Sequence, residues 1–449
     1  MTTHRTSMPK SKVTCPHCDK TTDTGHLTEH IQSCLKKKVV CKLCGKVVAR
    51  IRSHQCPPPK HPPHPQLSAY LDIEKHDWAS KCPLEFENGI KHLSSLDEHT
   101  ISLWNGQPPT LYTCKTQLSE ETIYTLVLSA IRKSTDYQVF RDEEVPPELG
   151  SNDQSIQRKR SAKSDLEDKK FRMAAAALYQ ATTTAPRQLT YSLLNVWAPD
   201  TSEILMQPPL QFQSTHHVCT ERFKVGINVT PKGSFVDLHH DILQRGLART
   251  IGRCKKVWLL FPGTPKNLEI YVSSTGFRNR LARIGSKLEG GIIVETDSSH
   301  EIEFPAHTLH AVFTTVGGFL TGINYSTVEC LTAMSQVLKA HLPIFHISPI
   351  AISEDVQSYI DALSSTLQMD LPAVLFVALQ SWIELRPVIE ETLDSGKTTA
   401  RFQRQVQEVD DCLHHFGENV QMALQCGCGQ FVDNIGNHVI ESHRLLQLQ

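Results

Sequence analysis

Three residues in the central part of the chain have the types that bind a catalytic metal ion. His239 and Asp241 lie two positions apart, and His310 follows further along the chain. Side chains at positions i and i+2 of a strand point to the same face, so His239 and Asp241 are predicted to face one ion together. Two imidazoles and one carboxylate on one face of an octahedron are the ligand set of non-haem Fe(II), which leaves open positions for a co-substrate and O₂. The absence of a thiolate from this set argues against a structural zinc site.

The elements that must position these residues are predicted to be strands. Between residues 186 and 326, short β-branched and aromatic runs are separated by Gly, Pro and Asn, which is typical of a β-sandwich or barrel. His239 and Asp241 lie between two such runs, and His310 opens another. The runs are Phe223–Thr230, Val257–Phe261, Gly291–Glu295, Ala311–Thr315 and Phe319–Tyr325.

With these residues in place, the segment 223–326 resembles a JmjC domain, the cupin-type double-stranded β-helix of Fe(II)/2-oxoglutarate oxygenases. The resemblance rests on the His-x-Asp pair, on His310, and on the run from Gly252 to Pro262, in which a Lys precedes an apolar strand ending in Pro. Ser192–Trp197 is similar to the family's lead-in strand. The resemblance implies an α+β multidomain chain with a jelly-roll core, helical flanks and small zinc-finger modules. It also implies that His239, Asp241 and His310 hold Fe(II), that Lys256 pairs with the distal carboxylate of 2-oxoglutarate, and that Asn324 lies near this co-substrate.

One position departs from the family pattern. The family's distal His usually follows a Pro-x-Gly turn, but here His307 stands where that Gly would be. We therefore expect backbone strain at His307, which is also an alternative ligand to His310. The hydroxyl partner of 2-oxoglutarate has two candidates, Thr230 and Ser234. Lys255 is one position out of register with Lys256 and is expected to face the opposite side of its strand.

The resemblance implies an oxygenase that hydroxylates or demethylates a protein substrate, with a histone tail among the substrates of the family. Fe(II), 2-oxoglutarate and Zn(II) are the expected cofactors. The alternative is a zinc-finger protein that binds nucleic acid or chromatin and whose barrel is an inert scaffold.

Two Cys/His clusters between residues 15 and 56 are predicted to bind zinc. A tight Cys-x2-Cys turn supplies two ligands, and a helix with His and Cys four positions apart supplies two more. The first cluster fits this pattern, whereas the second has a shorter arm, so one ion shared by the two Cys-x2-Cys pairs is an alternative, as is recruitment of His61 or His64. The predicted ligands are Cys15, Cys18, His30, Cys34, Cys41, Cys44, His54 and Cys56.

A third Cys/His cluster lies near the end of the chain. Cys426 and Cys428, followed by His438 and His443, resemble a degenerate Cys2His2 finger in which Gly427 loosens a Cys-x-Cys turn. We expect these four residues to bind zinc and to depend on it for folding, because a unit this small has little core of its own.

Charge divides the chain into a basic head and an acidic body. Residues 1–60 hold 12 Lys and Arg against 3 Asp and Glu, and the remaining 389 residues hold 34 against 44. A basic head is predicted to bind DNA or chromatin by counterion release, with protein binding as the alternative. Arg158–Lys163 resembles a nuclear localisation signal, so the nucleus is the expected location and the cytoplasm the alternative. The start of the chain lacks the apolar stretch of a signal peptide, and the longest apolar runs are too short for a membrane span, so no membrane partner is expected.

Length alone, at 449 residues, predicts about three domains. Helical periodicity is strongest in Glu120–Lys133, Val356–Leu367, Ala373–Leu385 and Thr399–Leu424. The predicted segments are two zinc-finger-like modules (1–56), a Pro-rich linker (57–66), a mixed region (67–141), a basic linker (142–164), a JmjC-like barrel (186–326), a helical region (327–425) and a C-terminal finger (426–443).

Overall fold

The computed structural model divides the chain into two compact units, Met1–His61 and Pro62–Gln449. In the first unit it describes four short strands, at residues 12–14, 21–23, 39–40 and 47–48. In the second unit it describes residues 81–83, 85–114, 118–133, 137–141, 160–183, 191–197, 206, 225–241, 244–275, 279–369 and 371–445.

The first unit contains two antiparallel hairpins. Strand β1 (Lys12–Thr14) pairs with β2 (Thr21–Asp23), and β3 (Val39–Val40) pairs with β4 (Val47–Val48). In the sequence, each hairpin encloses one Cys-x2-Cys pair. The predicted zinc ligands from Cys15 to Cys56, and the Pro-rich linker after them, lie outside the described residues.

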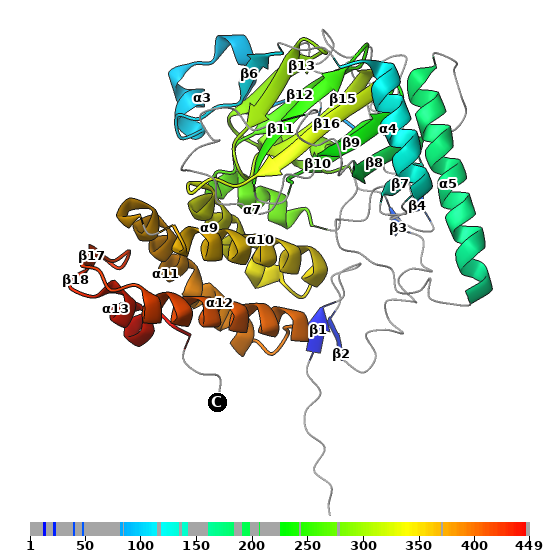
Figure 1. Ribbon diagram of the computed structural model, residues 1–449. Helices are drawn as coiled ribbons and strands as arrows, with labels where there is room; N and C mark the ends of the chain where they lie inside the picture. Colours follow the sequence, from blue (N-terminus) through cyan, green and yellow to red (C-terminus); the bar gives the residue numbers. More distant parts are fainter. Residues whose placement is uncertain are drawn as a thin grey trace, which may run out of the picture. The chain divides into compact units, whose positions relative to one another are not determined.

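Two mainly antiparallel sheets form the centre of the second unit (Figure 1). The smaller has the strand order β10-β15-β12-β13-β5, and only its β13–β5 pair is parallel. The larger has the order β6-β14-β11-β16-β9-β8-β7. The smaller sheet contains β5 (Ile90–His92), β10 (Phe235–His239), β12 (Lys255–Phe261), β13 (Gly291–Thr296) and β15 (Leu309–Val316). The larger contains β6 (Thr110–Thr113), β7 (Gln138–Arg141), β8 (Tyr191–Trp197), β9 (Gly226–Thr230), β11 (Arg245–Ile251), β14 (His300–Phe304) and β16 (Gly318–Tyr325).

The two sheets pack on a shared apolar core. Trp258 and Val312 of the smaller sheet belong to the same buried cluster as Phe304 and Leu320 of the larger one. From β9 to β16, the chain crosses repeatedly between the sheets, an arrangement consistent with a jelly roll. The predicted β-rich texture is confirmed, and the strands expected from apolar runs all occur with small shifts of their ends.

The sheets also include strands from outside the predicted barrel. Three of them, β5, β6 and β7, come from residues 90–141, which the sequence assigned to a separate mixed region. The sheet structure therefore begins well before residue 186. Helix α4 (Glu120–Lys133) has the bounds predicted for it, and α5 (Arg160–Thr182) begins inside the segment predicted as a basic linker. Both helices pack on the larger sheet through a common apolar cluster. The short helix α3 (Glu98–Leu103) lies between β5 and β6 in the chain.

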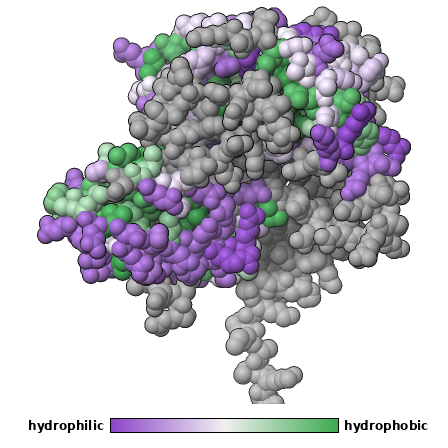
Figure 2. All heavy atoms as spheres, viewed as in Figure 1, coloured by the Kyte–Doolittle hydropathy of each residue, from purple (hydrophilic) through white to green (hydrophobic). Residues whose placement is uncertain are grey.

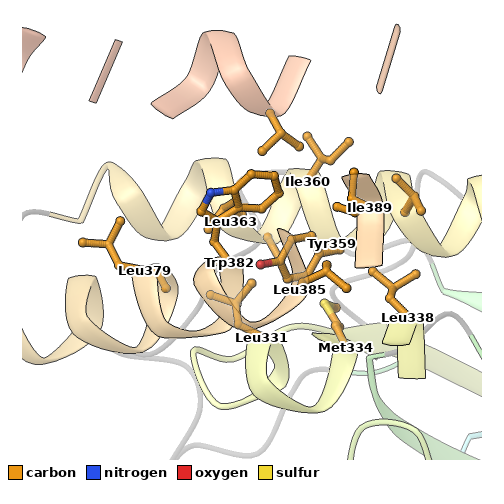
Figure 3. Close-up of a cluster of buried hydrophobic side chains, with 14 of the residues drawn as sticks. Leu331, Met334, Leu338, Tyr359, Ile360, Leu363, Leu379, Trp382, Leu385 and Ile389 are labelled. Carbon is orange, nitrogen blue, oxygen red and sulfur yellow. The ribbon is translucent and has the colours of Figure 1, made fainter. Parts of the chain in front are cut away.

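Helices make up the C-terminal part of this unit. They are α9 (Cys330–His341), α10 (Pro349–Leu367), α11 (Pro372–Asp394) and α12 (Ala400–Asn419), and they share one large apolar core that includes Trp382 and Tyr359 (Figure 3). All three helices predicted here have different bounds. Helix α10 begins at Pro349 rather than at Val356, α11 continues past Pro387, and α12 stops at Asn419 rather than at residue 424. Helix α9 has no counterpart among the predicted helices. Two shorter helices, α7 (Pro265–Ser273) and α8 (Arg280–Ile284), lie between the strands β12 and β13 in the chain.

The C-terminal Cys/His segment forms a small hairpin followed by a helix. Strand β17 (Leu424–Gln425) pairs with β18 (Phe431–Val432), and α13 (Ile435–Ser442) follows. This segment packs into the helical core, since Cys426, Ile435 and Val439 are buried within it. The indole nitrogen of Trp382 also donates to the carbonyl of His443, at 2.8 Å. The segment therefore shares the apolar core of the helical region.

Helix α11 is, among the described helices, long and apolar enough to cross a membrane if length and composition alone are considered. Its side chains Leu379, Trp382 and Leu385 are fully buried among the neighbouring helices, as Figure 3 shows. Core helices of water-soluble folds pass the same test, so this is weak support for a membrane span. Figure 2 shows hydrophilic residues along the face of the neighbouring helix α12.

Candidate metal and co-substrate site

The structure brings His239, Asp241 and His310 together at the ends of two paired strands. In the antiparallel pair of β10 and β15, His239 lies directly opposite His310, and their ring centroids are 4.2 Å apart. Asp241 follows β10. Its Oδ1 is 3.7 Å from His239 Nε2, and its Oδ2 is 3.9 Å from His310 Nε2. One potential ligand atom from each residue lies within 4.8 Å of the others, so this group can hold a metal ion.

Backbone carbonyl groups orient both imidazoles of this triad. His239 Nδ1 donates to the carbonyl of Asp237 at 2.7 Å, and His310 Nδ1 donates to the carbonyl of Thr308 at 3.1 Å. A carbonyl can only accept, so each Nδ1 carries the proton and each Nε2 lone pair faces Asp241. Ligating histidines are usually held in this way. Burial, followed by the nearby His239, lowers the pKa of His310 to about 4, which keeps its ring neutral and able to bind a cation.

Another acidic residue close to the triad is already engaged in structure. The carboxylate of Asp237 accepts hydrogen bonds from the backbone N–H groups of Arg280 and Leu281, at 2.7 and 3.0 Å. Asp237 thereby satisfies amides at the start of the short helix α8, which would otherwise lack partners. This separates its role from that of Asp241, although the two residues are only four positions apart.

Lys256 points into the protein, as the sequence indicated. It is 2% exposed, and its Nζ donates to Thr230 Oγ1 at 2.7 Å and to Thr314 Oγ1 at 2.9 Å. Burial lowers the pKa of this ammonium group. Its neighbour Lys255 faces the other side of β12, where its Nζ lies 3.9 Å from an oxygen of Glu295. The predicted difference between the two lysines is therefore confirmed by their positions.

Of the two candidate hydroxyl residues, Thr230 lies beside the lysine and Ser234 does not. Ser234 Oγ instead lies 3.2 Å from Ser192 Oγ. The sequence reasoning missed Thr314, the second hydroxyl partner. Thr314 is directly opposite Lys256 in the pairing of β12 and β15, and it is four positions after His310 on one strand. The period of two along a strand could have identified it as a residue on the same face as His310.

One cavity of about 810 Å³ contains these groups. Its wall includes the triad and Lys256, and Asn324 of β16 lines it as well. Between the metal-type triad and the lysine, the wall is formed by Trp258 of β12 and Val312 of β15. The cavity extends beyond the sheets to helices α9, α10 and α12, so it is shared by the β-rich and helical parts of this unit.

His307 does not join the triad. Its backbone has φ of 55°, so the strain expected from a histidine at a glycine-type position is present. The ring lies close to Gly263, where an added Cβ would come within 2.5 Å of His307 Nδ1. Burial, followed by the nearby His240, lowers the pKa of His307 to about 4. The structure thus places His310, rather than His307, beside Asp241.

The C-terminal Cys/His residues converge as a second metal-type group. Cys426 Sγ is 3.3 Å from His443 Nε2, Cys428 Sγ is 3.4 Å from His438 Nε2, and the two Nε2 atoms are 3.0 Å apart. Burial raises the pKa of Cys426 to about 11 and lowers that of His443 to about 4. Both shifts disfavour charged side chains, and a bound cation would offset the cost of the thiolate. Four such ligands suit tetrahedral coordination.

Comparison with known proteins gives a limited relationship. No family model matches the chain. JmjC domain-containing histone demethylation protein 1 of Candida glabrata is 28% identical over 108 residues, which are 24% of this chain and 27% of that protein. The proteins of the same name from Saccharomyces cerevisiae and Kluyveromyces lactis are 29% and 27% identical over 114 and 107 residues, 25% and 24% of this chain. The match spans about a quarter of the length of each relative, 23% and 22% for these two. The chain is thus distantly homologous, over about a quarter of its length, to JmjC domain-containing histone demethylation proteins.

Proposed function

We propose that this protein is a JmjC-type oxygenase dependent on Fe(II) and 2-oxoglutarate, built on a double-stranded β-helix. It hydroxylates or demethylates a protein substrate. The observation that carries this proposal is the buried ammonium group of Lys256, which lines the same cavity as the His/Asp/His triad. Within the described part of the chain, hydroxyl groups contact this ammonium and no carboxylate pairs with it. Burying a cation is costly unless it is paired, so the lysine suits an anionic ligand that enters the cavity.

The residues of the triad suit Fe(II), because their Nε2 and carboxylate atoms converge while the Nδ1 atoms of both histidines are already bonded. His239, Asp241 and His310 would hold the ion. Bound Fe(II) would supply the activation of O₂ and the oxidative decarboxylation of 2-oxoglutarate. Such a ligand set leaves positions open for the co-substrate.

The protein's own groups would bind and orient the co-substrate. Lys256 would pair with the distal carboxylate, and the hydroxyls of Thr230 and Thr314 would hold that ammonium group in position. A carboxylate at this place would raise the lowered pKa of Lys256 and stabilise its charged form. Asn324 would contact the co-substrate from the opposite sheet. The apolar wall of Trp258 and Val312 would limit access of water between the two ends of the site.

The relatives are named for histone demethylation, and this supports a histone or other chromatin protein as the substrate and the nucleus as the location. The C-terminal cluster of Cys426, Cys428, His438 and His443 would bind structural zinc. The two N-terminal clusters would do the same in the basic head, which would contact DNA or chromatin.

Substitution of the two adjacent lysines tests the oxygenase proposal. The wild-type protein, titrated anaerobically with Fe(II) and 2-oxoglutarate, should develop a weak visible charge-transfer band. We expect Lys256→Ala to weaken 2-oxoglutarate binding on the order of 100-fold, because loss of one partner of a buried ion pair costs roughly 3 kcal/mol or more. Lys255→Ala, which changes an exposed neighbour, should bind as the wild type does. A folded wild-type protein without the band would instead support the inert scaffold, and an unchanged Lys256→Ala titration would refute the co-substrate role.

A salt titration tests the basic head. The affinity of the full-length chain for duplex DNA should fall steeply as salt rises, because each neutralised phosphate releases counterions. A chain without residues 1–60 should bind weakly and with a shallow slope. Equal slopes for the two proteins would count against nucleic-acid binding by this head.

A further inference from the structure

A third group of metal-type side chains lies where the smaller sheet meets the helical region. His240 follows β10, His341 ends α9, and Asp355 lies in the second turn of α10. One potential ligand atom from each lies within 4.8 Å of the others. All three residues line the large cavity. His240 and Asp355 are 115 positions apart in the chain, so the fold, and not local spacing, brings the group together.

The distances within this group suit a metal ion better than a direct hydrogen bond. His341 Nδ1 is 3.5 Å from Asp355 Oδ2. Two ligands at about 2.0–2.1 Å from one tetrahedral ion lie roughly 3.3 Å apart, close to this value. A charge-assisted hydrogen bond between imidazole and carboxylate would be shorter, at about 2.7–2.9 Å. In the described part of the chain, no donor forms a hydrogen bond with the Asp355 carboxylate.

His240 is held in the manner of a ligating histidine. Its Nδ1 donates to the backbone carbonyl of Asp241 at 2.8 Å, so its Nε2 carries the lone pair. Tyr271 packs beside both histidines, with ring centroids 5.5 Å from His240 and 6.3 Å from His341. The phenol of Tyr271 accepts a 2.6 Å hydrogen bond from Arg280, which fixes this wall of the group.

Two of the three residues are buried, and one of these two is acidic. His341 and Asp355 are each 7% exposed. A carboxylate in such surroundings is unfavourable unless a cation or hydrogen-bond donors compensate it. A divalent ion would supply that compensation for Asp355. With the imidazoles of His240 and His341, three of its four tetrahedral positions would be filled.

We propose that His240, His341 and Asp355 form a zinc site that joins the sheet to the helical region and keeps one open position facing the cavity. Imidazole and carboxylate ligands suit Zn²⁺, and three protein ligands with an open fourth position are the pattern of zinc sites that bind a further molecule. The open position would accept an oxygen or nitrogen donor from the occupant of the cavity. The site does not depend on the proposed oxygenase function, because zinc can be counted without iron or 2-oxoglutarate.

Metal content of iron-free protein tests the site. Full-length protein equilibrated with Zn²⁺ and freed of excess metal should contain one more equivalent than either Asp355→Asn or His341→Gln. Two matched controls, Asp361→Asn on the same helix and His346→Gln on the exposed surface after α9, should keep the wild-type content. With Co²⁺ in place of Zn²⁺, the two site variants should lose visible ligand-field intensity but keep the near-ultraviolet thiolate bands of the Cys clusters. Retained thiolate bands also report that the helical core is folded.

Equal zinc content in the wild type and both site variants would overturn the proposal. A second measurement does not depend on the folding of any variant: crystals of the wild-type protein soaked in Zn²⁺ should show anomalous density between the three side chains. An empty position there would also overturn it. So would a finding that zinc has no effect on the Tm difference between His341→Gln and the wild type, which would indicate a histidine–aspartate ion pair only.

Discussion

The cavity triad and the C-terminal Cys/His cluster are both metal-type groups, but the chain builds them differently. The cluster draws its four potential ligand residues from 18 consecutive positions, Cys426 to His443. The triad needs the ends of two strands that are paired in one register, with His239 opposite His310. The first is encoded by local spacing, whereas the second exists only when the whole sheet has formed. Residues elsewhere in the sheets can therefore change the environment of the triad while its own three residues stay the same.

The C-terminal cluster and the triad also differ in the number of their potential ligand residues and in their access to the cavity. The C-terminal cluster has four potential ligand residues and packs within the apolar core of the helices, so it is suited to hold structure. The triad has three potential ligand residues and opens into a cavity of about 810 Å³. This cavity also contains the ammonium group of Lys256, which contacts two hydroxyl groups and, among the described residues, pairs with no carboxylate. Four protein ligands fill a tetrahedral ion and suit a structural role, whereas three leave a position at which a further molecule can bind and react.

The largest expected effect comes from removing one ligand of the triad. We expect His310→Ala to abolish turnover and to weaken iron retention by more than the roughly 10–100-fold that loss of an outer hydrogen-bond partner causes. Zinc in the C-terminal cluster should be unchanged, because the two groups share no residue. Metal analysis and anaerobic spectroscopy on the same preparation measure both outcomes.

His300→Ala is the matched control, since His300 lies on β14 outside both groups and is partly exposed. It should retain iron and activity. If His310→Ala also loses zinc, metal binding at the triad and at the C-terminal cluster is coupled, and the two groups do not act independently. If it retains iron, His310 is not a ligand.

The next effect concerns the closed cluster. Cys426→Ser and Cys428→Ser should each release the C-terminal zinc and leave the iron site occupied. We expect the free energy of unfolding to fall by about 3–5 kcal/mol for Cys426→Ser, a loss comparable to that of a structural cross-link. The fall should be smaller for Cys428→Ser, because Cys428 is exposed while Cys426 lies in the helical core. Denaturant unfolding measures both values.

A chelator separates the two parts of this effect. Added to the wild type, it should lower stability to the level of Cys428→Ser, and it should not affect Cys428→Ser further. If the chelator leaves the unfolding free energy of the wild type unchanged, packing alone, without zinc, keeps this segment folded.

Sequence reasoning reached the parts of the fold that are encoded locally. Helix α4 agrees with its predicted bounds because its apolar residues recur at helical spacing. Lys256, which the resemblance to the family's Lys-to-Pro run singled out, does lie on the inner face of β12. Strand β5 was missed because only Ile90 of its three residues is buried, which leaves almost no pattern to read. Thr314 and the His240 group were missed for a different reason: their partners come from distant segments, and only the paired strands and packed helices define those contacts.

The smallest expected effect is the contribution of His307 to the pH dependence of the unfolding free energy. Burial lowers the pKa of His307 in the folded protein to about 4, below the usual value of about 6.5. As the pH falls below about 6.5, the unfolded chain takes up a proton that the folded chain excludes. The stability associated with His307 is therefore complete above about pH 6.5 and is lost progressively down to about pH 4.

His307→Asn removes this proton uptake while keeping a residue type that tolerates the left-handed backbone. Between pH 6 and 5, its unfolding free energy should fall less steeply than that of the wild type, by up to about 1.4 kcal/mol per pH unit. Urea unfolding at several pH values, with chelator present, measures the difference in slope. His346→Asn, which replaces an exposed histidine, should follow the wild-type curve. If His307→Asn follows it as well, His307 takes up its proton equally well in the folded and unfolded chains, and its burial in the turn before β15 has no energetic consequence for titration.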